Sequence, residues 1–280
     1  MSATLASRGR APAAQLGAGA LAAYGLMGLP LAMAALPLYV HLPRFYGEHL
    51  GVGLAALGVL LLVLRLADGL LDPLLGAWSD RSRSRRTLVA LSVPVLTVGM
   101  VALFAPPLGG EGALLAWLAV SLALVYLAFG LATINHSAWG AELSDDPVER
   151  TRVTAVREAL ALGGVVLASL APALLGGDDG DAAGLPRFAL VFAPIAFACL
   201  ALLYLAPPGT RAVVARRPLF AGMTEPLRDA LFRPLLAVFV ANGIASASTS
   251  AIGIVIMWVR YRVYEPVATG RHTCHPSAGV

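Results

Sequence analysis

Three ionisable residues stand close together inside one long apolar run of this sequence. Arg65, Asp68 and Asp72 are spaced i, i+3 and i+7, so their side chains share one face of an α-helix. A charge near the middle of a bilayer costs about 2.5–3.5 kcal/mol on insertion scales. We therefore expect these side chains to line a polar cavity or to pair with one another.

The two carboxylates on this face predict a cation-coupling site. Asp68 and Asp72 repel one another, which favours a bound cation or a shared proton, and Arg65 can neutralise only one of them. Pro73 supports this interpretation, because a proline frees the carbonyl near Gly69, one turn earlier, and a polar cavity can satisfy it. The simpler alternative is a structural ion pair of Arg65 with Asp68, with Asp72 near enough to the membrane surface to be hydrated.

A charged run follows directly after this face. It contains Gly76, then Asp80 and Arg81, and later Arg85 with its basic neighbour. The run resembles the signature of the loop between helices 2 and 3 of the major facilitator superfamily, although Arg83 stands where a second glycine is usual. An aspartate near a helix end can form charge-assisted bonds with flanking arginines. We expect these residues to form a gate that holds the cytoplasmic side closed in one conformation; the alternative is a generic basic loop.

A second stretch makes the resemblance more specific. Residues 135–152 read Asn-His-Ser-Ala-Trp-Gly-Ala-Glu-Leu-Ser-Asp-Asp-Pro-Val-Glu-Arg-Thr-Arg, and Arg157 follows. Together with the first pattern, this resembles the glycoside–pentoside–hexuronide:cation symporter family, the melibiose-permease group. Residues 242–246, Asn-Gly-Ile-Ala-Ser, are a third match. The resemblance extends over approximately residues 20–260.

The resemblance implies cation-coupled (proton or sodium) secondary transport of a small polar solute, a sugar or glycoside, by alternating access. It implies that Asp68 and Asp72 hold the coupling cation beside Arg65. The implied substrate-binding residues are Arg157, Asn135, His136 and Trp139, and Glu142 and Arg150 join the gate residues Gly76, Asp80, Arg81 and Arg85.

Three of the implied substrate residues have a simpler alternative. Arg157 could anchor the helix at the cytoplasmic surface or pair with Glu158. For Trp139 we favour an anchor at the membrane interface over a platform for a sugar. His136 is equally consistent with a hydrogen bond between two helices.

Two departures from the family pattern bear on the solute and the ion. Sugar-binding members carry an acidic residue in helix 1 and another in helix 4, whereas residues 24–37 and 129–135 contain none. Melibiose-like sugars are therefore disfavoured. The same absence leaves few oxygen ligands around Asp68 and Asp72, so we favour a proton, which needs one carboxylate, over sodium, which needs several oxygens.

The elements that must position these residues are membrane-spanning helices. Of the 280 residues, 58% are hydrophobic and 13% charged, against about 25% charged in soluble domains. A spanning helix needs about 20 apolar residues. Seven runs qualify: 17–41, 51–77, 87–106, 113–139, 153–175, 187–206 and 234–259. The predicted fold is an all-α polytopic membrane protein, with a major-facilitator N-terminal six-helix bundle plus one helix of the second half.

The distribution of arginine predicts the orientation. Fourteen arginines fall on one side of these spans, and only Arg44 and Arg187 fall in loops on the other. By the positive-inside rule, the N-terminus is cytoplasmic. We therefore attribute the net charge of +4 to membrane topology and expect no nucleic-acid partner. The expected location is the bacterial inner (plasma) membrane, and the expected partners are the lipid bilayer and a small polar solute.

The chain divides into five parts: a cytoplasmic tail (1–16), a six-helix bundle (17–206), a central cytoplasmic loop (207–233), a seventh helix (234–260) and a polar tail (261–280). This is the order of the first half of a twelve-helix transporter, apparently truncated after helix 7. We expect a second chain to complete the carrier, or else a truncated, non-transporting paralogue or fragment. No nucleophile elbow, phosphate loop or metal-ligand cluster is evident in the sequence, so we predict no enzyme activity, no metal site and no cofactor other than the coupling ion.

Overall fold

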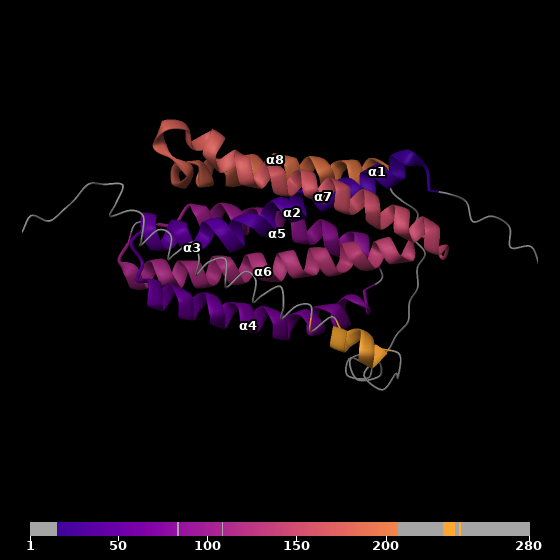
Figure 1. Cartoon of the computed structure of the whole chain (residues 1–280), viewed down its shortest axis with the longest axis horizontal. Coiled ribbons are helices and arrows are strands. Elements are labelled where there is room, and N and C mark those ends of the chain that lie inside the picture. Colours follow the sequence, from indigo (N-terminus) through magenta and orange to yellow (C-terminus); the bar gives the residue numbers. More distant parts are fainter. Residues whose placement is uncertain (1–15, 83, 108, 207–231, 239–240, 242–280) are drawn as a thin grey trace, which may run out of the picture. The chain divides into compact units, whose positions relative to one another are not determined.

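The computed structural model describes residues 16–82, 84–107, 109–206, 232–238 and 241. Within these residues, six helical segments are long and apolar enough to cross a bilayer (Figure 1). This finding confirms the predicted class of an all-α polytopic membrane protein. The first segment, Ala18–His49, consists of α1 (Ala18–Leu26), α2 (Gly28–Leu36), the π-helical η1 (Pro37–His41), α3 (Leu42–Arg44) and the π-helical η2 (Phe45–His49). The other five segments are α4 (Leu54–Ser79), α5 (Arg85–Phe104), α6 (Glu111–Glu142), α7 (Pro147–Gly176) and α8 (Asp181–Leu205), with a 3₁₀ turn η3 (Gly177–Asp179) before α8.

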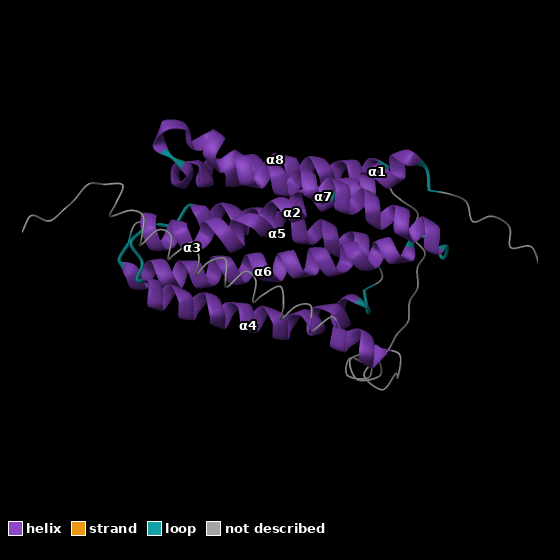
Figure 2. Ribbon diagram, viewed as in Figure 1, coloured by secondary structure: helices purple, strands orange, loops and turns teal. Residues whose placement is uncertain are grey.

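These six segments correspond to the first six predicted spans. Several helices continue beyond the apolar run that predicted them, so that α6 and α7 nearly meet across a short turn (Figure 2). Residues 232–238, which include the end of the predicted central loop and the start of the predicted seventh span, are helical and belong to a separate unit of the chain. The rest of that span, residues 1–15, residues 207–231 and the C-terminal tail lie outside the described residues.

Local caps fix where two charged helices begin. The side chain of Ser84 accepts a hydrogen bond from the backbone N–H of Thr87, which places Arg85 at the first residue of α5. The side chain of Asp146 accepts from the N–H of Val148, and Pro147 occupies the first position of α7.

Small residues allow the helices to pack closely. α5 packs mainly on α6, α7 packs on α2 and α8, and α4 packs on α6. A Cβ on Gly28 would lie 2.9 Å from the carbonyl oxygen of Arg157, and one on Gly99 would lie 2.7 Å from Val125. Close approach of this kind is how helices associate in lipid, where dispersion contacts replace the hydrophobic effect.

The helix that carries the acidic pair, α4, is the least buried of the six. Its leucines 62, 66 and 70 are exposed, as expected for side chains in contact with lipid acyl chains. Its other face packs on α6, and the ionisable residues lie on that side.

Candidate functional site

A cavity of about 230 Å³ lies between α4 and α6. Arg65, Asp68 and Asp72 all line it, so the structure brings together the three ionisable residues that the spacing placed on one face. The other lining residues come from the first span, α4 and α6: Tyr39, Gly69, Phe129, Gly130, Thr133 and Ile134.

Arg65 neutralises one of the two acids. Its Nη1 donates to Oδ2 of Asp68 at 3.0 Å, and the Asp68 side chain is only 14% exposed. The guanidinium also lies over two tyrosine rings, 5.1 Å from the centroid of Tyr39 and 5.8 Å from that of Tyr126. Such contacts stabilise a cation beside an aromatic face. The Arg65–Asp68 pair of the simpler alternative is therefore formed. That alternative also expected a hydrated Asp72, whereas Oδ1 of Asp72 is buried.

Asp72 and Thr133 place two further oxygens in the same cavity. Oδ1 of Asp72 and Oγ1 of Thr133 are buried, and neither has a hydrogen-bond partner among the described residues. Gly130 makes room for the carboxylate, because a Cβ there would lie 2.8 Å from Oδ1 of Asp72. A buried polar atom without a partner costs about 1–3 kcal/mol. Both oxygen atoms can therefore accept a hydrogen bond or ligate a cation.

The backbone adds another polar group to the lining. Gly69 lines the cavity and has no side chain, so its main chain faces that space. Pro73, four residues later in α4, has no N–H to donate to the carbonyl of Gly69. The cavity therefore combines two carboxylates and a hydroxyl, and its lining residue Gly69 has a carbonyl to which Pro73 cannot donate.

Sequence reasoning did not single out Thr133 and Gly130 as site residues. They lie three residues apart in the fourth span, on the face of α6 that meets α4. Their spacing could predict a role in the site only if the acidic face of α4 were already known to pack on this face of α6.

Arg157 lies on α7 and is not among the residues that line this cavity. Its Nη1 donates to Oγ of Ser137 at 3.0 Å, and its Nη2 donates to Oε1 of Glu158 at 2.6 Å. The pair with Glu158 is therefore present, as one alternative expected. The Arg157 side chain is 22% exposed.

His136 and Trp139 are enclosed between helices. Nε2 of His136 lies 3.0 Å from the carbonyl oxygen of Tyr24, the hydroxyl of Tyr24 donates to the carbonyl of His136 at 2.9 Å, and the two rings stack at 4.4 Å. Trp139 is 1% exposed and meets the Tyr24 ring edge-on. In this conformation both residues join α6 to α1. Neither exposes a surface for a solute, and Trp139 is not at an exposed position where it could anchor the helix at the membrane interface.

Arg85 is the centre of a polar network that joins the ends of α4, α5 and α6. Its Nε donates to Oε1 of Glu142 at 2.7 Å, its Nη2 to Oδ1 of Asp80 at 3.0 Å, and its Nη1 to Oγ of Ser79 at 2.9 Å. Ser79 in turn donates to the side chain of Asn135, which is fully buried. We call these five residues the Arg85 network. Asn135 thus belongs to the network and does not line the cavity.

The other predicted gate residues lie at the same ends of the helices. The carbonyl of Gly76 accepts from the N–H of Asp80, and Arg81 is exposed. Nε of Arg150 donates to the carbonyl of Ser144 at 2.6 Å, within the turn between α6 and α7. One contact was not expected: the guanidinium of Arg86 lies 3.7 Å from the ring centroid of Tyr204 on α8.

The described residues contain no group of three or more His, Cys, Asp or Glu side chains arranged to hold a metal ion. The cavity between α4 and α6 remains the place where carboxylate oxygens gather inside the bundle.

Comparison with known proteins gives a consistent result. Residues 21–257 match a family model described as "MFS/sugar transport protein". The chain is 29% identical over 194 residues to the inner membrane symporter YicJ of Escherichia coli (strain K12), a match that covers 66% of this chain and 41% of the relative. It is 30% identical over 177 residues to an uncharacterized symporter, sll1374, of Synechocystis sp. (59% and 31%). It is 31% identical over 140 residues to an uncharacterized symporter, YnaJ, of Bacillus subtilis (strain 168) (46% and 29%). The chain therefore matches less than half the length of each of these relatives.

Proposed function

Since the chain belongs to the MFS/sugar transport family, we propose that it takes part in the cation-coupled secondary transport of a sugar or glycoside by alternating access. The family and the relatives described above are transporters, not enzymes.

The observation that carries this proposal is the pair of buried oxygens on Asp72 and Thr133. They line one cavity with Asp68, and no hydrogen bond from the described residues satisfies them. Ionisable and polar groups inside a membrane-spanning bundle are costly and mark ion pathways. A cation between α4 and α6 would supply the missing partner to both oxygens and would offset the repulsion between the two carboxylates.

We assign the coupling ion as sodium. The sequence favoured a proton, because few oxygen ligands were evident around Asp68 and Asp72. The cavity supports sodium because Thr133 adds a hydroxyl to the two carboxylates, and Gly69, whose carbonyl cannot accept a hydrogen bond from Pro73, also lines it.

Arg65 gives the site a means of responding to the ion. Its guanidinium holds Asp68 at 3.0 Å. A cation that binds Asp68 competes with Arg65 for the carboxylate oxygens, so ion binding weakens this pair. Arg65 is half exposed and can then reorient without an additional burial cost.

The solute site is proposed to include Arg157. Its planar guanidinium already donates to a hydroxyl, that of Ser137, and a sugar hydroxyl offers the same acceptor.

The distribution of arginine suggests that the Arg85 network closes the cytoplasmic end. Breaking its bonds between Arg85 and the acids Asp80 and Glu142 would open that end and release the solute.

Two ion gradients test the assignment. The purified chain, reconstituted in liposomes, is expected to accumulate radiolabelled methyl glycosides under an inward sodium gradient and not under an inward proton gradient of equal size. Isothermal titration in nanodiscs at neutral pH is expected to show heat on addition of sodium chloride and none on addition of choline chloride. Uptake driven only by the proton gradient would show that the coupling ion is a proton and not sodium. Sodium binding without uptake would restrict this chain to ion binding, as the non-transporting alternative requires.

A further inference from the structure

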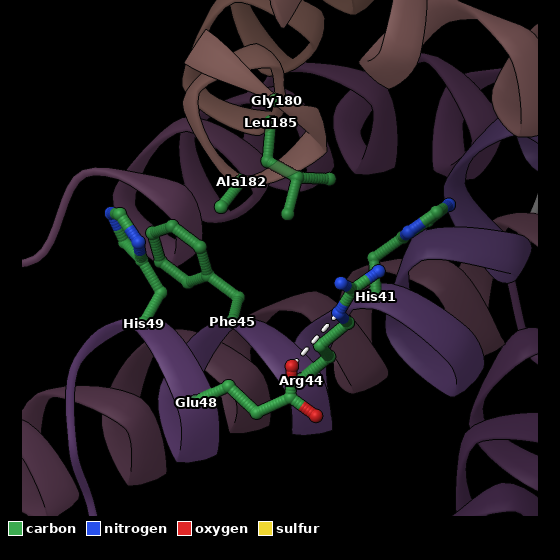
Figure 3. Close-up of a pocket in the computed structure, with 8 residues that line it drawn as sticks. All are labelled: His41, Arg44, Phe45, Glu48, His49, Gly180, Ala182 and Leu185. Atoms are coloured by element: carbon green, nitrogen blue, oxygen red, sulfur yellow. Dashed lines mark hydrogen bonds and ion pairs between the residues drawn. The ribbon is translucent and has the colours of Figure 1, made fainter. Parts of the chain in front are cut away.

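A second cavity, of about 450 Å³, lies at the other end of the helices from the Arg85 network. Polar side chains of His41, Arg44, Glu48 and His49, from the end of the first span, line one side of it. Gly180 and Ala182, at the start of α8, line the other side (Figure 3). We call this cavity the outer pocket. Its volume falls within the range of about 300–1,000 Å³ that is typical of small-molecule sites.

Two of the residues that line the outer pocket carry opposite charges. Nε of Arg44 donates to Oε2 of Glu48 at 2.9 Å, and the two side chains are 67% and 69% exposed. A guanidinium beside a carboxylate presents several N–H donors and oxygen acceptors to the solvent without a net charge. This pair of donors and acceptors suits a neutral molecule that carries many hydroxyl groups.

An aromatic wall adjoins this polar pair. The ring of Phe45 stacks on the imidazole of His49, with centroids 5.6 Å apart and planes inclined by 24° (Figure 3). Phe45 is buried, so the stacking fixes the orientation of the exposed imidazole. A fixed aromatic surface beside paired donors and acceptors matches a sugar ring, which has apolar C–H faces and hydroxyl groups on its edge.

The backbone of this segment is itself irregular. The lining residues of the first span lie on η1, α3 and η2, and the two π-helical segments each end at a histidine, His41 and His49. π-Helical turns are rare and occur frequently at functional sites. The irregularity widens the last turns of the first span at the position where the outer pocket forms.

We propose that the outer pocket binds a neutral sugar or glycoside on the non-cytoplasmic side, before the solute reaches the interior of the bundle. The proposal rests on the proposed function, because the expected ligand of the outer pocket follows from the transport of sugars. The arginine distribution predicts that the pocket lies on the non-cytoplasmic side of the membrane. Glu48 and Arg44 bind the hydroxyl groups, and the imidazole of His49, supported by Phe45, contacts the ring.

Protection of a cysteine in the pocket tests the proposal. In a chain with Cys199 and Cys274 replaced by alanine, the variant Ala182→Cys places a thiol on the pocket lining. Methyl β-D-glucopyranoside or methyl α-D-galactopyranoside is expected to slow its reaction with a maleimide by about threefold or more. Adding Glu48→Ala is expected to abolish this protection.

A matched variant controls for loss of an exposed acid. Asp145, in the turn after α6, is 74% exposed and faces Arg150, much as Glu48 faces Arg44. Asp145→Ala is expected to leave the protection of the Ala182→Cys thiol unchanged. Absence of protection by both glycosides, or equal protection with and without Glu48→Ala, would overturn the proposal.

Sodium titration of the same samples separates this inference from the proposed function. Sodium binding without glycoside protection overturns the outer pocket alone. Protection without sodium binding overturns the proposed coupling ion and leaves the outer pocket supported as a sugar site.

Discussion

Oδ1 of Asp72 on α4 lies directly against Gly130 on α6, so that a Cβ at Gly130 would lie only 2.8 Å from this oxygen. This contact holds one carboxylate between two helices and away from lipid. The space that a glycine leaves is therefore part of the site, because a larger side chain would occupy the position of the carboxylate.

The variant Gly130→Ala is expected to weaken sodium binding by about tenfold, which corresponds to roughly 1.4 kcal/mol. The added methyl group forces the Asp72 carboxylate to rotate away from Thr133. Gly163→Ala is the control, since a Cβ there meets nothing within 4 Å and the residue also lies within a long helix, α7. Titration calorimetry in nanodiscs measures both variants, and an equal affinity for the two would show that Gly130 has no part in the site.

Thr133→Val removes one oxygen and keeps the shape of the side chain. We expect sodium affinity to fall by about tenfold or more, since a buried ligand is lost. Thr97→Val is the control, because the Thr97 hydroxyl donates to Val93 within its own helix, α5, at 2.8 Å. The two variants also separate the candidate ions: a proton-coupled carrier would keep its proton-driven uptake in Thr133→Val, because Asp72 alone can carry the proton.

Arg85→Gln is expected to loosen the helix ends that the Arg85 network joins. Glu142 and Asp80 lose their guanidinium partner, and because these groups are partly exposed the loss is about 1–2 kcal/mol of unfolding free energy. Arg81→Gln, at an exposed position, is expected to change it by no more than about 0.5 kcal/mol. Thermal unfolding in nanodiscs gives the comparison, and equal melting temperatures for the two variants would contradict the central place of Arg85.

Tyr24→Phe tests whether the contact of α1 with α6 is structural. The variant removes the hydroxyl that donates to the carbonyl of His136 and is expected to cost about 1 kcal/mol of stability with no change in sodium affinity. Tyr204→Phe keeps the ring beneath Arg86 and is the control. A fall in sodium affinity at unchanged melting temperature would instead connect Tyr24 and His136 to the ion site.

The sequence predicted the architecture well for identifiable physical reasons. Apolar runs of about 20 residues have few alternatives to membrane-spanning helices, and the six described spans follow them. The motifs around Asp68, Asp80 and Glu142 predicted the symporter family, which the family match confirms. The common face of Arg65, Asp68 and Asp72 needed only the helical period, so their shared cavity could also be anticipated.

The partners of those residues could not be predicted in the same way. α6 is apolar around most of its circumference, so periodicity does not indicate which of its faces meets α4 and which meets α1. The resemblance implied substrate roles for Asn135, His136 and Trp139, although we favoured an interface anchor for Trp139, and the structure encloses all three between helices. Thr133 and Gly130, on the face that does meet α4, were missed for the same reason.

Equilibrium binding of radioactive sodium to Asp72→Asn, in nanodiscs at neutral pH, tests the central claim most directly. The account predicts saturable binding to the unmodified chain, its loss in Asp72→Asn, and full binding in the control Asp145→Asn, whose carboxylate is exposed at the Arg-rich end of the helices. Binding in Asp72→Asn equal to that of the unmodified chain, or no saturable binding to either, would contradict a sodium site between α4 and α6.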